Sequence, residues 1–166
     1  MVLTTRSFAG IVLAAGLLVL GAALLSQYWG GLYPCELCLL ERWPWRAAIA
    51  ISAVAWLAGE RLARPVPPIL LATVFAVSAV IAFYHVGVEQ HWFAGPSACT
   101  ASGTEAGSVD ALRAQLLGRQ PVMCDEVQWS LFGISLAGWN LLASLALAAF
   151  CVAAARGRRL RRTAAA

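Results

Sequence analysis

Four long apolar stretches constrain this chain more than any other feature. They cover about residues 8–26, 43–59, 69–86 and 132–155. A helix needs about 20 mostly apolar residues to cross the hydrocarbon core of a bilayer. Hydrophobic residues make up 61% of the sequence and charged residues only 12%, whereas soluble domains have about a quarter charged residues. The pattern predicts an all-α membrane protein, a four-transmembrane-helix bundle that forms one domain over residues 1–166.

Prolines set the expected helix limits. Pro65, Pro67 and Pro68 precede the third stretch and suit the first turn of a helix. Pro44 disfavours helix across positions 40–44, so we expect the second span to begin near Trp43. The first stretch is longer than the apolar core of a usual signal peptide, and we therefore expect an uncleaved span.

The basic residues predict the orientation in the membrane. Cytoplasmic segments carry an excess of basic residues, and one side of the predicted bundle holds twice as many as the other. The eight arginines of that side are Arg6, Arg61, Arg64, Arg156, Arg158, Arg159, Arg161 and Arg162, against Arg42, Arg46, Arg113 and Arg119 opposite. We expect both termini in the cytoplasm and two loops, about 27–42 and 87–131, outside. The basic tail suits anionic lipid, and no nucleic-acid partner is expected.

The second outer loop is too long for a simple connector. Residues 108–117 have Ser108 as a possible N-cap and apolar side chains at helical spacing. This spacing predicts a short amphipathic helix, which lies on the membrane surface or packs on the bundle.

Four of the five cysteines fall on the outer side, where disulfides persist. Cys35 and Cys38 form a C-x-x-C in the first loop, and Cys99 and Cys124 lie in the second. Cys151 lies deep in the fourth stretch and is expected to be a small buried residue.

The C-x-x-C suits redox chemistry. A nearby positive charge makes a thiolate more reactive, and Arg42 follows Cys38 by four residues. Zinc is the alternative for such a motif, but the second pair lacks the spacing of a four-cysteine site, so no metal is expected. A Cys99–Cys124 disulfide could also be purely structural, worth about 3–4 kcal/mol for a loop of this size.

Two cysteine pairs in series suggest an electron relay by thiol–disulfide exchange, from a soluble thiol protein to a lipid-soluble acceptor. A transporter is a poorer interpretation, because the predicted spans hold no carboxylate, lysine or histidine at mid-membrane.

The same residues resemble the DsbB family of membrane thiol oxidases. The resemblance extends over nearly the whole chain and includes Gln27, Pro34 to Cys38, Glu41 and Arg42, Tyr84 and His85, Cys99, and Cys124 to Gly133. Vitamin K epoxide reductases are related, but they place the C-x-x-C after the loop pair. The order of the cysteines here favours DsbB.

The resemblance implies a mechanism in the bacterial inner membrane. Cys99 is attacked by a reduced, periplasmic DsbA-like protein of the thioredoxin fold, and Cys124 then exchanges with Cys35. Cys38 becomes the thiolate beside a quinone, either ubiquinone or menaquinone. Arg42 polarises the quinone, His85 lies nearby and Trp129 borders it. No role follows for Glu89 or His91. The alternatives are structural loop disulfides and a quinone reductase of the vitamin K epoxide reductase type.

Overall fold

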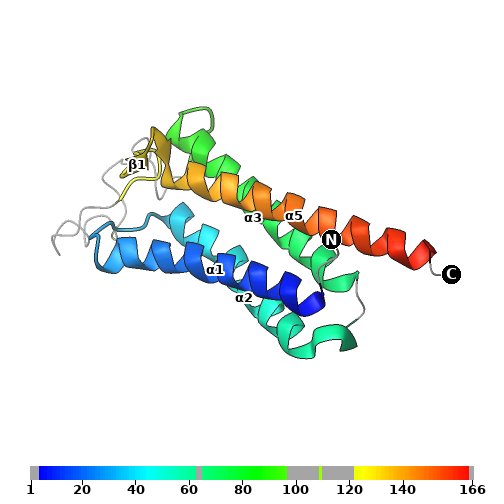
Figure 1. The fold of residues 1–166 in the computed structure, drawn as a ribbon. Coiled ribbons are helices and arrows are strands. Elements are labelled where there is room, and N and C mark those ends of the chain that lie inside the picture. The colour runs from blue at the N-terminus through cyan, green and yellow to red at the C-terminus, as the bar shows by residue number, and fades with distance from the viewer. Residues whose placement is uncertain (1–3, 63–64, 97–108, 110–121, 165–166) are drawn as a thin grey trace.

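A computed structural model describes residues 4–62, 65–96, 109 and 122–164, the last seven by their backbone only. Four long helices dominate this part of the chain (Figure 1). They are α1 (Thr5–Tyr28), α2 (Glu36–Ala58), α3 (Val66–Glu89) and α5 (Leu136–Ala164). A 3-10 turn, η1 (Gly59–Arg61), follows α2, and a hairpin of β1 (Ser130–Leu131) and β2 (Ile134–Ser135) precedes α5. The expected surface helix lies outside the described residues, except for Val109.

The helices run alongside one another as a bundle. α1 packs against α2, α2 against α3, and α3 against α5. The N-terminus of α1 and the C-terminus of α5 lie at one end of the bundle, and the hairpin and the start of α2 lie at the other (Figure 1). An antiparallel arrangement with both termini at one end is what four consecutive helices with short inner connections produce.

Side-chain caps explain where two of the helices begin. The Thr4 hydroxyl accepts a hydrogen bond from the backbone N–H of Ser7 at 3.1 Å, which satisfies one free donor of α1. Cys35 occupies the same position before α2, and its Sγ accepts from the N–H of Cys38 at 3.2 Å. The first half of the C-x-x-C is therefore also the N-cap of a helix.

α2 begins at Glu36. The proline pattern predicts a start near Trp43, and this prediction is wrong. Pro44 lies inside the helix and cannot donate a hydrogen bond to the carbonyl of Leu40. The helix continues because one face is held on both sides of the proline. Leu37, Glu41 and Trp45 are all buried on that face, and the Cys35 cap fixes its first turn. Burial of this face offsets a cost of about 3 kcal/mol for an interior proline.

The core takes side chains from all four helices. Phe8 stacks on Phe150 with ring centroids 5.5 Å apart, and Trp45 meets the edge of Phe75 at 5.4 Å. Cys151 is fully buried in this cluster and is a free thiol, as expected of a small apolar residue. A buried hydrogen bond from Ser144 to Ser78, 2.9 Å long, joins α5 to α3.

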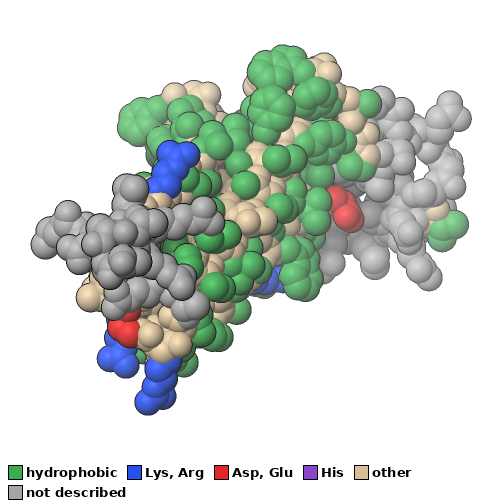
Figure 2. Space-filling view, turned by 90° about the vertical axis from the view of Figure 1, so that its right-hand side faces the viewer, with side chains coloured by type: hydrophobic (Ala, Val, Ile, Leu, Met, Phe, Trp, Pro, Cys, Tyr) green, Lys and Arg blue, Asp and Glu red, His purple; other side chains and the backbone are tan. Residues whose placement is uncertain are grey.

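The outside of the bundle is apolar. Figure 2 shows hydrophobic side chains over most of one described face, and Leu18, Leu57 and Val80 are each about 70% exposed. Such a surface suits lipid rather than water. In the described part, α1, α3 and residues 136–157 of α5 are long and apolar enough to cross a membrane. α2 does not meet that criterion, because its first half carries Glu36, Glu41, Arg42 and Arg46.

The fourth expected stretch begins with a hairpin instead of a helix. Phe132 and Gly133 form its two-residue turn, and both have positive φ, 53° and 76°. This combination is the type I′ turn that suits a tight antiparallel hairpin. The Ser135 hydroxyl then accepts from the N–H of Gly138 at 3.1 Å, so that α5 starts at Leu136.

Candidate functional site

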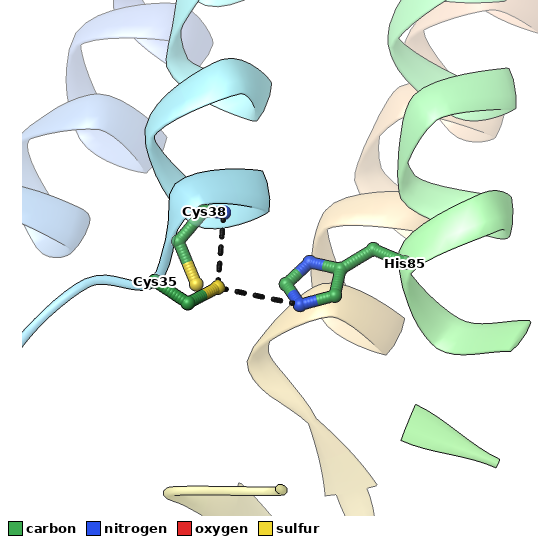
Figure 3. A group of neighbouring side chains, drawn as sticks. All are labelled: Cys35, Cys38 and His85. Carbon is green, nitrogen blue, oxygen red and sulfur yellow. Dashed lines mark hydrogen bonds between the residues drawn. The ribbon is translucent and has the colours of Figure 1, made fainter. Parts of the chain in front are cut away.

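The two cysteines of the C-x-x-C lie where α2 meets α3. Cys35 is almost fully buried and Cys38 is partly exposed, and both are free thiols. His85, on α3, directs its imidazole at Cys35, with 3.6 Å between Nε2 and Sγ (Figure 3). A contact of this length between a thiol and a ring nitrogen permits transfer of a proton between them.

A chain of hydrogen bonds extends from His85 into the bundle. Its Nδ1 lies 2.7 Å from Oε1 of Glu41, which is buried on α2. The amide of Asn140 on α5 donates to the other oxygen of Glu41 at 2.6 Å, and Trp45 Nε1 donates to Asn140 Oδ1 at 2.7 Å. The carboxylate therefore fixes the orientation of the imidazole, and three helices hold the carboxylate.

Arg42 also points inward. Its guanidinium donates to Oε1 of Gln27 on α1 at 2.7 Å, and the residue is only 9% exposed. Gln27 and Arg42 both belong to the set of residues that resembles the DsbB family. The bond places a fixed positive charge close to the C-x-x-C, one helical turn after Cys38.

Cys124 comes from a distant part of the chain to the same place. It is disulfide-bonded and buried, and it packs in one cluster with Cys35, Leu37 and Val88. Cys38 borders this cluster. Cys99 lies outside the described residues. A disulfide sulfur of the second pair thus shares a buried environment with the C-x-x-C.

A cavity of about 690 Å³ opens beside these groups. Its walls are mainly apolar, with a few polar side chains that converge on the C-x-x-C. This composition and size are typical of a site for a small organic ligand. The lining includes Cys35, Cys38, Glu41, Arg42, Trp45, His85, Glu89, Gln128, Trp129 and Asn140.

Local contacts favour ionisation of Cys35. Its hydrogen bond with the side chain of Cys38 lowers the pKa of the Cys35 thiol, and the backbone N–H groups of Cys38 and Leu37 lower it further. Burial and the charge of Glu41 act in the opposite direction without reversing the shift. When both thiols of the pair are reduced, the first thiolate to form is that of Cys35.

The structure places all the described residues expected to bind the acceptor around one cavity. Cys38, Arg42, His85 and Trp129 line it, while Cys124 lies in one buried cluster with Cys35. Sequence reasoning gave no role to Glu41 or Asn140, although both hold the imidazole in place. A lone asparagine near the start of an apolar span was a usable signal, because a polar side chain there is usually functional.

Three neighbouring side chains of the site, two thiols and one imidazole, could also hold a metal ion. Atoms of Cys35, Cys38 and His85 lie within 4.8 Å of one another. The sequence argument against zinc considered only the four loop cysteines and did not consider a histidine from α3.

Comparison with known proteins agrees with this geometry. The chain is 27% identical over 144 residues to "Uncharacterized protein RP370" of Rickettsia prowazekii (strain Madrid E), which covers 84% of this chain and 81% of that protein. No solved structure matches. Residues 5–154 match the family described as "Disulfide bond formation protein DsbB". This match includes every cysteine and the whole cavity, and the chain therefore belongs to the DsbB family of membrane disulfide bond formation proteins.

Proposed function

We propose that this protein is a thiol:quinone oxidoreductase that reoxidises a DsbA-like dithiol protein on the periplasmic side of a bacterial inner membrane. One observation carries the proposal. Disulfide-bonded Cys124 lies in one buried cluster with Cys35, which lines an apolar cavity together with Arg42 and His85. The arrangement brings the second cysteine pair, the C-x-x-C and a ligand site together.

The relay consists of two balanced thiol–disulfide exchanges, after which the C-x-x-C passes its electrons to the acceptor. The two thiols of the partner reduce the Cys99–Cys124 disulfide and leave as a disulfide, so two electrons and two protons enter this chain. Cys124 then attacks the oxidised C-x-x-C at Cys35, and resolution by Cys99 restores the loop disulfide and leaves Cys35 and Cys38 as thiols. The free thiols of Cys35 and Cys38 together with a disulfide at Cys124 correspond to this last state.

The cavity suits a quinone head group. Its walls are mainly apolar, and the guanidinium of Arg42 and the imidazole of His85 could contact the ring oxygens. A quinone bound there would accept two electrons and two protons and become a quinol. Ubiquinone and menaquinone share the features that this site would recognise.

His85 accepts a proton in this mechanism, and Cys38 supplies the thiolate beside the cavity. With its pKa lowered, Cys35 loses its proton readily, and the Nε2 of His85 lies 3.6 Å away to receive it. Glu41 stabilises the resulting imidazolium. While Cys35 is joined to Cys124, the thiol left beside the cavity is that of Cys38, and Arg42 stabilises its thiolate.

The proposal includes four membrane spans with both termini in the cytoplasm. α2 has 23 residues and is about 35 Å long at 1.5 Å per residue, enough to cross a hydrocarbon core of about 30 Å. Its charged residues lie at the end that carries the cavity, and Glu41 and Arg42 are buried there with partners. The arginine-rich end of α5 lies at the opposite end of the bundle (Figure 1).

Two measurements test the function. Purified protein in detergent is mixed with a reduced DsbA-like partner and a soluble quinone, and quinone reduction is followed by absorbance. Cys38→Ser should abolish turnover, whereas Cys151→Ala, altered in the core away from the cavity, should retain it. Equal rates in the unaltered protein and Cys38→Ser would contradict the proposal.

Trapping separates a relay from a structural disulfide. In Cys124→Ser, the Cys99 thiol attacks the disulfide of the oxidised partner and releases one partner thiol. No second loop thiol can then displace the partner, so a mixed disulfide should accumulate on a non-reducing gel. If no adduct forms while the protein remains folded, the second pair only stabilises its loop.

A further inference from the structure

We propose that Cys35, Cys38 and His85, when both cysteines are reduced, form a reversible Zn²⁺ site with one coordination position open to the cavity. The proposal goes beyond the redox function. It starts from three ligand-type atoms that the ends of α2 and α3 bring together (Figure 3).

The spacing matches tetrahedral zinc. With Zn–S near 2.3 Å and Zn–N near 2.0–2.1 Å, a tetrahedral site separates sulfur from nitrogen by about 3.6 Å. The Sγ of Cys35 and the Nε2 of His85 are 3.6 Å apart, and all three ligand atoms lie within 4.8 Å of one another. The side chain of Cys38 is partly exposed and lines the cavity, so it has room to adjust.

The histidine is already oriented as a zinc ligand. Histidines that bind zinc usually donate their second ring N–H to a carboxylate, which leaves the other nitrogen free for the metal. His85 shows this arrangement, with Nδ1 2.7 Å from Glu41 and Nε2 toward the sulfur. Asn140 in turn holds Glu41 at 2.6 Å, so the carboxylate needs no rearrangement.

The charges also balance. Two thiols release two protons when they bind Zn²⁺, and two thiolates with one Zn²⁺ are neutral, which limits the cost of burial. No electrons move. The guanidinium of Arg42 also lines the cavity and opposes a cation, but it is bonded to Gln27, and the carboxylates of Glu41 and Glu89 line the same cavity.

Binding depends on the redox state of the C-x-x-C. A disulfide lacks the thiolates that zinc requires, so the oxidised pair should bind no zinc. In the reduced state zinc would occupy both thiolates and stop electron transfer to the acceptor until a chelator removes it. The three-residue set with one open position resembles in composition a catalytic two-cysteine, one-histidine zinc site.

The experiment uses the full chain in detergent, without partner or quinone. Reduced protein, freed of reductant under argon, is titrated with Zn²⁺ against a chromophoric chelator, and separately with Co²⁺ to record the visible bands of a tetrahedral thiolate complex. We expect one tight ion per reduced chain and none per oxidised chain. Because the loop pair is also reduced here, all measurements are repeated in Cys99→Ser/Cys124→Ser.

Variants locate the site. His85→Ala should weaken binding at least tenfold and change the cobalt bands, and Glu41→Gln should weaken it about 10- to 100-fold. His91→Asn, which alters an exposed histidine that does not line the cavity, should bind as the unaltered chain does.

Three results would overturn the proposal. They are no cobalt bands in the unaltered reduced chain, equal affinity in His85→Ala, and loss of binding in Cys99→Ser/Cys124→Ser, which would indicate a four-cysteine site instead. None of them bears on the proposed redox function, since neither substrate is present in the assay.

Discussion

His85 shares its two ring nitrogens between a sulfur atom and a carboxylate. The contact with Cys35 gives it access to the reacting thiol, and the contact with Glu41 makes its protonated form more stable. Either contact alone is common in proteins. Together they allow one buried side chain to take up a proton when the thiol loses it, at a place where water has limited access.

Replacing this imidazole should slow the reaction without unfolding the protein. His85→Ala removes the proton acceptor, and we expect turnover with partner and quinone to fall about 100-fold, the lower end of the usual range for general acid–base catalysis. The matched control is His91→Asn, because asparagine tolerates the positive φ of 59° at that position. Quinone reduction is measured for both. A comparable fall in His91→Asn would show that the loss is not specific to the imidazole at the cavity.

At the level of residues, the sequence singled out side chains that the structure brings to the cavity, but not all of the residues that hold them in place. The cysteines, Arg42, His85 and Trp129 could be named because their types and their resemblance to DsbB point to function. Glu41 could not be paired with His85, because 44 positions separate them and only the packing of α2 on α3 brings them together. Asn140 is 99 positions from Glu41 and depends on a third helix.

α2 shows why one helix limit was predicted wrongly. Treating Pro44 as a helix boundary placed Glu41 and Arg42 in a loop, whereas they lie inside the helix. Leu37, Glu41, Trp45 and Ala48 recur at helical spacing on both sides of the proline and are all buried. That periodicity is visible in the sequence and would have extended the helix to the C-x-x-C. The cap by Cys35 is not visible, since cysteine is not a usual N-cap residue.

Pro44 should cost stability that alanine recovers. Pro44→Ala supplies an N–H for the carbonyl of Leu40 and removes the clash of the ring, so we expect the free energy of unfolding in mixed SDS micelles to rise by about 1–3 kcal/mol. Pro65→Ala is the control, because Pro65 lies at the N-cap of α3, where a helical N–H is not needed. No gain in Pro44→Ala would mean that the packing of α2 requires the proline.

Gly87 permits the turn that ends α3. The ring of Phe93 folds back over it, and a Cβ at Gly87 would lie 2.1 Å from a ring carbon. Gly87→Ala must displace that ring, and we expect a loss of about 1–3 kcal/mol in the free energy of unfolding. Gly21 lies in α1 with open space around it, so Gly21→Ala should instead stabilise by about 0.5–1 kcal/mol. The same SDS titration compares the two variants, and shifts of equal sign would contradict the packing described here.

The bundle as a whole separates two ends of different chemistry. Cys35, Cys38, Cys124, the cavity and the hairpin lie at one end, and the N-terminus of α1 and the C-terminus of α5 lie at the other (Figure 1). The sequence predicted this separation from its long apolar stretches, because their positions need no knowledge of packing. The orientation in the membrane, inferred from arginine counts, stays a prediction. The sequence could not predict how deeply Glu41, Arg42 and His85 are buried in the bundle, since their burial depends on the tilt and contacts of neighbouring helices.

Labelling in cells tests this orientation. Trp29→Cys introduces an exposed thiol at the cavity end, and Arg61→Cys introduces one at the opposite end. A membrane-impermeant maleimide should label Trp29→Cys in intact spheroplasts and Arg61→Cys only after permeabilisation, with the labelling of the unaltered chain subtracted as background. The reverse pattern, or equal labelling of both before permeabilisation, would rule out the proposed topology.

In the proposed relay, the sulfur that caps α2 is also the sulfur that changes partners during disulfide exchange. A thiolate accepts the N–H of Cys38 more strongly than a neutral thiol or a disulfide sulfur does, so the stiffness of the first helical turn should follow the number of electrons held by the pair. The backbone amide resonance of Cys38 in an NMR spectrum would then report the redox state of the pair without any added probe. Each turnover would be accompanied by a slight tightening and loosening of the first turn of α2.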